Sequence, residues 1–149
     1  MMKKPDMTMN LAAWLCGISL CLAAGMAPAH DHDHDHGGDA PAQLALNNGK
    51  KWPTDGALRA GMGRIRDAAG QEAQFAPAEL AKRIDGEIAT LVQNCKLDKE
   101  TDAMLHLVLA DLIAGAEILR ERPLARREAM ERITRGLRGY GTYFEHPGW

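Results

Sequence analysis

The sequence has few aromatic residues and no run of alternating apolar and polar residues of the kind that forms a β-strand. Its 149 residues include three Trp, two Tyr and two Phe, whereas aliphatic residues and Ala are frequent. Aromatic and β-branched side chains favour strands, and Ala and Leu favour helices. The composition therefore argues against a β-sheet fold and predicts an all-α protein.

The sequence also lacks an excess of positive charge. It contains 18 Lys and Arg residues against 20 Asp and Glu residues, which gives a formal net charge of −2 at pH 7. Proteins that bind nucleic acids usually present a positive surface to the phosphates. We therefore expect no nucleic-acid partner.

Motifs of common catalytic sites are missing as well. The sequence contains no His-Glu-x-x-His, no Gly-x-Ser-x-Gly and no phosphate-binding loop. Acidic and basic residues that lie near one another along the helices are typical of solvated helix faces. We therefore predict that the protein is not an enzyme.

No apolar run reaches the length of a membrane-spanning helix. The longest run, over residues 11–25, has about 15 residues, against the roughly 20 that a spanning helix needs. Lys3 and Lys4 precede it, and Ala27-Pro28-Ala29 follows it with small residues where a signal peptidase requires them. We predict a signal peptide over residues 1–29, cleaved after Ala29. The mature protein is then periplasmic or secreted, with no stable membrane insertion. The alternative is an uncleaved membrane anchor, which the short length of the apolar run disfavours.

Cysteine is scarce in the predicted mature chain. Cleavage removes Cys16 and Cys21 and leaves Cys95 alone, so no intramolecular disulfide can form. A lone thiol in an oxidising compartment is a free thiol, a metal ligand or an intermolecular bridge. The favoured alternative is that Cys95 fills core space as a small apolar residue.

Histidine and aspartate alternate directly after the predicted cleavage site. The candidate metal ligands are His30, His32, His34 and His36, with Asp31, Asp33 and Asp35 as charge partners. Neutral imidazole suits copper, zinc and nickel, and carboxylates offset the charge of the cation. Residues 30–53 are otherwise polar and rich in turn residues, which predicts a flexible tail and linker. The alternative is a solvated linker with no specific ligand.

The predicted cleavage would also place a histidine at the third position of the mature chain. With His30 first, His32 stands third, and residues 30–32 resemble the amino-terminal copper and nickel motif of the form Xaa-Xaa-His. This resemblance implies a square-planar set of the amine, two backbone nitrogens and the His32 imidazole. It depends on cleavage after Ala29, whereas the four-histidine cluster does not.

Four apolar stripes at helical spacing follow the tail. Their members are Leu58, Met62, Ile65 and Ala69; Leu80, Ile84, Ile88, Leu91 and Cys95; Leu105, Leu109, Leu112, Ala116 and Leu119, widened by Val108 and Ile113; and Met130, Ile133, Leu137, Tyr140 and Phe144. The expected boundaries are an N-cap at Thr54 and an end at Gly70, a start near Pro77, a cap at Asp98 and a stop at Pro123, and a last helix over Leu124 to Phe144. Short links between the helices predict an up-down-up-down four-helix bundle over residues 54–149.

Alternating helix directions bring several ligand-type side chains toward one end of this bundle. They are Met62, Cys95, His106 and His146, with Met104 and Tyr140 at the same end. Sulfur and imidazole together suit copper. Each residue also has a structural alternative, since Met62 lies on a core stripe, His106 at the edge of one, and His146 beyond a helix end. We expect Trp52 and Trp149 to cover this end of the bundle.

The helix pattern over Thr54 to Phe144 is similar to that of four-helix cytochromes of the b562 and c-prime type. The resemblance implies a haem-ligand Met on the first helix, here Met62, and an inward His on the last helix. This sequence has Tyr140, Gly141 and Tyr143 there, and it has no Cys-x-x-Cys-His motif. Gly61, Gly115 and Gly141 leave room for a cofactor or allow close helix contact. Non-covalent haem is therefore the less favoured alternative.

A second resemblance is carried by residues 46–55 and by Leu58-Arg59-x-Gly61-Met62. These look like a group of small exported bacterial proteins, some with a DnrO-type label. The resemblance implies a recurring exported domain and no particular activity.

The functional expectation is metal buffering or delivery by the His/Asp tail, with copper favoured over zinc and nickel. The first alternative is a module that binds an envelope or periplasmic protein through the Arg-rich last helix and the Trp-containing flanks. The second is an electron carrier with non-covalent haem.

Overall fold

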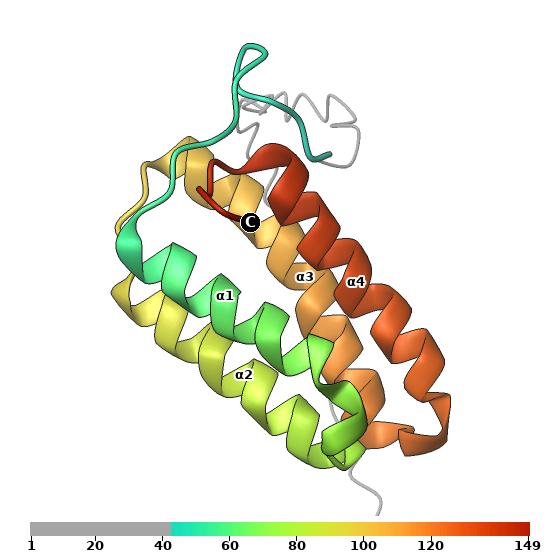
Figure 1. The fold of residues 1–149 in the computed structure, drawn as a ribbon. Coiled ribbons are helices and arrows are strands. Elements are labelled where there is room, and N and C mark those ends of the chain that lie inside the picture. Colours follow the sequence, from blue (N-terminus) through green and yellow to red (C-terminus); the bar gives the residue numbers. More distant parts are fainter. Residues whose placement is uncertain (1–42) are drawn as a thin grey trace, which may run out of the picture. The chain divides into compact units, whose positions relative to one another are not determined.

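The computed structural model describes residues 43–149, in which four antiparallel helices form an up-down bundle (Figure 1). The helices are α1 (Gly56–Gly70), α2 (Pro77–Asn94), α3 (Lys99–Glu121) and α4 (Arg126–Tyr143). Two 3₁₀ turns join them, η1 (Glu72–Gln74) and η2 (Pro123–Ala125). Each helix packs against the next in sequence, and α1 also contacts α4. The predicted all-α, up-down-up-down architecture is confirmed.

The start of α1 differs by one residue from the prediction, because Asp55 and not Thr54 is the N-cap. One carboxylate oxygen of Asp55 accepts a hydrogen bond from the backbone N–H of Leu58 at 2.7 Å, and the other accepts from the N–H of Lys96 at 2.6 Å. A carboxylate has two acceptor oxygens, and Asp55 offers one to each donor. The Thr54 hydroxyl donates instead to the carbonyl of Glu145.

The other helix boundaries follow the sequence signals closely. Pro77 opens α2, and Asp98 caps α3 by accepting from the N–H groups of Glu100 and Thr101. Helix α3 ends before Pro123, as predicted. This proline opens η2, so that α4 begins at Arg126 rather than at Leu124, and the Leu124 side chain is fully exposed.

The predicted apolar stripes form the core. All of the stripe residues of α1 are buried, as are those of α2 before Cys95 and the five central members of the α3 stripe. In the last stripe, Ile133 and Tyr140 of α4 are buried, and so is Phe144 directly after the helix. Cys95, Met130 and Leu137 are half-buried at the edge of the core. Val108 is buried as predicted, but Ile113 is exposed, because the outer arc of α3 faces solvent between its contacts with α2 and α4.

Helices α3 and α4 approach each other closely at two glycines. A Cβ atom at Gly115 would lie 2.5 Å from Cγ1 of Ile133, and one at Gly136 would lie 3.1 Å from the carbonyl oxygen of Val108. Side chains from the opposite helix occupy the space that a larger residue would need. Gly115 therefore serves helix contact rather than room for a cofactor.

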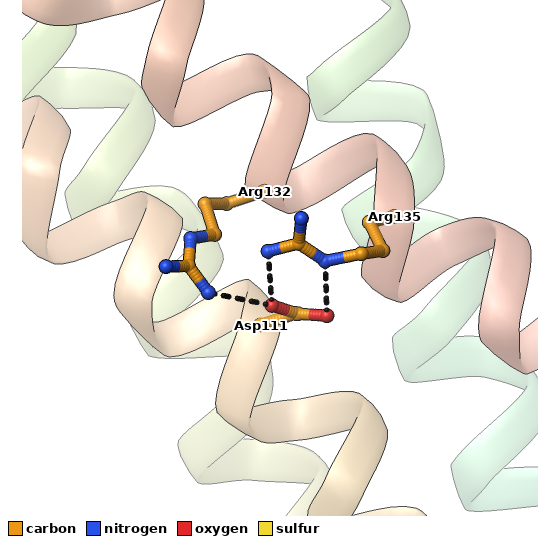
Figure 2. Close-up of polar contacts among 3 residues, drawn as sticks. All are labelled: Asp111, Arg132 and Arg135. Atoms are coloured by element: carbon orange, nitrogen blue, oxygen red, sulfur yellow. Dashed lines mark hydrogen bonds and ion pairs between the residues drawn. The ribbon is translucent and has the colours of Figure 1, made fainter. Parts of the chain in front are cut away.

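A three-residue ion-pair cluster also joins these helices. Asp111 on α3 accepts hydrogen bonds from Arg135 at 2.7 and 2.8 Å and from Arg132 at 3.2 Å (Figure 2). Arg135 binds both carboxylate oxygens of Asp111 in a bidentate pair, which fixes the relative orientation of the two side chains. The Asp111 side chain is 24% exposed, so the cluster lies at the edge of the helix interface.

The segments that flank the helices pair with each other at one end of the bundle, where both are visible in Figure 1. We call residues 43–55 the leading segment and residues 144–149 the closing segment. The N–H of Trp52 donates to the carbonyl of Tyr143 at 2.7 Å, and the N–H of Glu145 donates to the carbonyl of Trp52 at 2.8 Å. The short parallel bridge between Trp52 and Phe144 results.

A tight turn precedes this bridge. Asn47 and Lys50 exchange backbone hydrogen bonds of 2.8 and 2.9 Å, and Asn48 and Gly49 both have positive φ angles, of 49° and 80°. Two successive positive φ angles are the signature of a type I′ turn, for which Asn-Gly is the preferred pair. Much of the expected linker before Thr54 thus has a defined conformation against the bundle.

Within residues 43–149, none of the helices combines the length and the apolar character that a membrane span requires.

Candidate functional site

The predicted metal-binding tail lies outside the described residues. His30, His32, His34 and His36, and the intervening Asp31, Asp33 and Asp35, all precede Gln43, where the structural description begins. Metal binding by these residues therefore remains a prediction from the sequence.

The four further ligand candidates lie in different surroundings within the bundle. Met62 is fully buried in the core, and His106 is exposed on α3 with Nδ1 2.9 Å from the carbonyl oxygen of Asp102. Cys95 is half-buried at the end of α2, and His146 is half-buried in the closing segment. Across residues 43–149, no group of three or more His, Cys, Asp and Glu side chains is arranged to hold a metal ion.

The surroundings of Cys95 favour the thiol over the thiolate. Partial burial raises the pKa of Cys95, and the nearby carboxylates of Asp55 and Asp102 raise it further. The thiolate is the form that attacks electrophiles and binds metals. At neutral pH Cys95 is therefore protonated, which fits its place beside the core.

The best-defined polar constellation of the bundle is formed by α4 and the closing segment. The Tyr140 hydroxyl lies 3.0 Å from Nδ1 of His146. The Tyr140 ring stacks on Phe144 at 5.2 Å between ring centroids and meets the Trp149 ring edge-on at 4.6 Å. Trp52 is buried behind the same segment, so the expectation that Trp52 and Trp149 cover this end is confirmed.

Burial sets the protonation states of this pair. Burial raises the pKa of Tyr140 far above its ordinary value, so that the phenol keeps its proton. Partial burial lowers the pKa of His146, and the guanidinium groups of Arg66 and Arg59 lower it further. At neutral pH the pair therefore consists of a neutral phenol and a neutral imidazole.

Two arginines of α1 face the closing segment. The guanidinium carbon of Arg66 lies 4.7 Å from the centre of the Trp149 ring, in a cation–π arrangement. Nη1 of Arg59 donates to the carbonyl oxygen of Thr54 at 2.6 Å and to its hydroxyl at 3.0 Å. Arg59 thus ties the first turn of α1 to the residue that contacts Glu145.

An open groove of about 490 Å³ lies between the start of α1 and the closing segment, and both Arg59 and His146 line it. Its walls are Pro53, Thr54, Arg59, Ala60, Glu145, His146 and Pro147. The volume lies within the range of small-molecule sites. We treat this groove as the candidate site of the described part of the chain.

The sequence pointed to His146 and Tyr140 but not to the arginines beside them. Arg59 and Arg66 are seven residues apart, and this spacing places both on one face of α1 next to the core stripe. The absence of a side chain at Gly141 makes room for the Trp149 ring, since a Cβ atom at Gly141 would lie 2.5 Å from Cδ1 of Trp149. The fold of the closing segment was needed to bring these residues together.

Comparisons with models of protein families, with curated proteins and with solved structures gave no match, so the structure supports a four-helix all-α domain without a family assignment.

Proposed function

We propose that this protein is an exported metal-binding protein that buffers or delivers metal ions in the periplasm. The predicted ligands are His30, His32, His34 and His36, with Asp31, Asp33 and Asp35 as charge partners. The observation that carries the proposal is the strict alternation of His and Asp directly after the Ala27-Pro28-Ala29 cleavage signal. Copper is favoured over zinc and nickel.

The chemistry of the tail supports this choice of metals. Four imidazoles within seven residues offer several nitrogen donors to one ion, and imidazole suits copper, zinc and nickel. If the chain begins at His30, the free amine and His32 add the square-planar set that Cu(II) and Ni(II) prefer. Protonation of the imidazoles near pH 6 would weaken binding, which suits reversible hand-over.

The first described residues after the predicted tail pack on the bundle. A Cβ atom at Gly139 of α4 would lie 3.0 Å from Cδ1 of Leu44, so Leu44 of the leading segment packs against α4. Trp52 is buried, and its indole N–H donates to the carbonyl oxygen of Ala45 at 2.6 Å. The described segment that follows the predicted tail in the sequence therefore has fixed contacts with the bundle.

A calorimetric titration with Cu(II), Zn(II) and Ni(II) tests the proposal. The protein that begins at His30 is compared with a version that begins at Asp39, which lacks all four histidines but keeps every described residue of the bundle. We expect tight binding in the first protein and its loss in the second, with Cu(II) bound most tightly. Equal stoichiometry and affinity in both proteins would reject the tail as the site.

A protein-interaction module is the second candidate function, and one surface of α4 favours it. Arg127, Met130 and Arg138 line a groove on this helix, and Leu124 is fully exposed just before it. The Trp-containing flanks do not add to this surface, because Trp52 is buried and Trp149 packs on Tyr140. Co-purification of a partner that survives truncation to Asp39, and that is lost in the double variant Arg127→Glu/Arg138→Glu, would favour this candidate.

The resemblance to small exported proteins of the DnrO-type label accords with a periplasmic location, and we propose the chain as a member of that exported group. We do not propose haem binding, because Met62 is enclosed by the core and Nδ1 of His146 is engaged by the Tyr140 hydroxyl.

A further inference from the structure

We propose that the groove between α1 and the closing segment binds the carboxylate group of a small ligand through Arg59 and His146. The lining of this site includes no residue of the His/Asp tail, and the proposal goes beyond the metal function. It is built from two distant parts of the sequence, the first turns of α1 and the residues that follow α4.

Arg59 has donors that the fold leaves available. Its contacts within the described residues are made by Nη1 alone, to the carbonyl and hydroxyl oxygens of Thr54. No carboxylate of residues 43–149 lies within ion-pair distance of its guanidinium, and Arg59 lines the groove. The guanidinium has five N–H donors in a planar fork, which matches a carboxylate in a bidentate pair. The contacts to Thr54 hold the side chain in place before a ligand arrives.

His146 adds a second donor. Its Nδ1 is engaged by Tyr140, whose hydroxyl has no other partner in the described structure. We assign Tyr140 as the donor, since the reverse arrangement would leave the buried phenol proton without an acceptor, at a cost of about 1–3 kcal/mol. In that tautomer Nε2 carries the proton of the neutral imidazole. His146 lines the groove, so this N–H is the donor that the neutral imidazole can offer to an anion there.

The charges around the groove favour a monoanion. The guanidinium groups of Arg59 and Arg66 both act on His146 from α1, and Tyr140 on α4 is neutral. The carboxylate of Asp55 acts on Arg59 and on Tyr140, but it is bound to the N–H groups of Leu58 and Lys96. The charges that act directly on the imidazole are therefore positive. Glu145 is the one acidic side chain on the lining that the structure describes, and it is exposed. Its negative charge disfavours a doubly charged phosphate more than a singly charged carboxylate. Pro53, Ala60 and Pro147 supply apolar walls for the body of the ligand.

The test follows the ring resonances of His146 by NMR in the metal-free protein, titrated with sodium acetate and, separately, with inorganic phosphate at constant ionic strength. The resonances are assigned with the variant His146→Gln. An anion bound beside the imidazole stabilises its charged form. We expect a saturable shift and an upward move of the His146 titration with acetate, and a weaker response to phosphate.

Matched variants on α1 decide the assignment. Arg59→Gln should abolish the saturable response, whereas Arg64→Gln should keep it. Arg64 does not line the groove, and its guanidinium pairs with the carboxylate of Glu87 at a distance of 2.6 Å. Arg59→Lys keeps the charge and guards against loss through misfolding, and it should retain a weakened response. The absence of a saturable shift, an equal shift in Arg59→Gln, or a tighter response to phosphate would overturn the proposal. Metal binding by the tail enters none of these readouts.

Discussion

At the level of single residues, Asp55 shows how one side chain can perform two structural tasks. Its first oxygen caps α1 through Leu58, and its second accepts from Lys96 in the link between α2 and α3. Partial burial opposes ionisation, but the hydrogen bonds from the N–H groups of Leu58, Lys96 and Ala57 outweigh it and lower the pKa of Asp55. The carboxylate is thus held ionised at the point where three helices meet the leading segment.

Replacement of Asp55 should therefore cost more than an ordinary capping substitution. We expect Asp55→Ala to lower the free energy of unfolding by about 2 kcal/mol, since it removes the cap and the acceptor for Lys96. Asp55→Asn keeps an oxygen for Leu58 but turns an amide toward Lys96, so its loss should be smaller. Urea denaturation at pH 7 measures both, and an equal loss in the two variants would contradict the assignment of two separate bonds.

At the level of secondary-structure elements, the pairing of α3 with α4 depends on small residues in the interface and on ion pairs at its edge. Gly115 and Gly136 let the backbones approach, and Asp111 links to Arg132 and Arg135 just outside (Figure 2). Close approach leaves no room for larger side chains, whereas the ion pairs depend on the charge of one carboxylate. Packing and electrostatics in this interface can therefore be tested separately.

The packing is tested by a pair of glycine substitutions. Gly115→Ala should destabilise the bundle by about 1–3 kcal/mol, because the added methyl would overlap Ile133 and approach the carbonyl of Ala129. Gly86→Ala on α2 is the control, since nothing lies within 4 Å of its Cβ position. The control should stabilise the protein by up to about 1 kcal/mol through helix propensity. Thermal unfolding of the two variants should give shifts of opposite sign.

The ion-pair cluster is tested through pH. The hydrogen bond from Arg135 is the largest cause that lowers the pKa of Asp111, and Arg132 adds to it. A carboxyl group with a lowered pKa in the folded state stabilises the fold above its unfolded pKa, which is about 4. This contribution is lost as the pH falls from there through the folded pKa.

Asp111→Asn should therefore be less stable than the wild-type protein at pH 7, and the difference should shrink below about pH 4. Because the arginines are half-exposed, we expect a small difference that weakens with added salt. Urea midpoints measured between pH 3 and pH 7 provide the readout. A difference that is independent of pH would show that the cluster does not act through its charge.

For the molecule as a whole, the sequence was informative wherever local rules decide the outcome. Apolar spacing predicted the four helices, and Pro77, Asp98 and Pro123 marked boundaries that the structure reproduces. The cap at Asp55 and the exposure of Ile113 were missed because both depend on tertiary neighbours, the Lys96 backbone in one case and the helices packed against α3 in the other. Local pattern does not contain that information.

The candidate groove was predictable only in part for the same reason. His146 and Tyr140 could be placed at one end of the bundle from helix directions alone. Their hydrogen bond and the approach of Arg59 require the closing segment to fold back and pair with Trp52, which no periodicity signals. The proposed metal site of the His/Asp tail is the opposite case, since that proposal rests on the sequence alone.

The central claim is that the histidines of the tail hold the metal, and a Cu(II) titration by calorimetry on two matched variants tests it most directly. One variant carries His30→Asn, His32→Asn, His34→Asn and His36→Asn, and the other carries Asp31→Asn, Asp33→Asn and Asp35→Asn. We predict that the histidine variant loses tight binding, while the aspartate variant keeps the wild-type stoichiometry with weaker affinity. Unchanged Cu(II) stoichiometry and affinity in the histidine variant would contradict the claim.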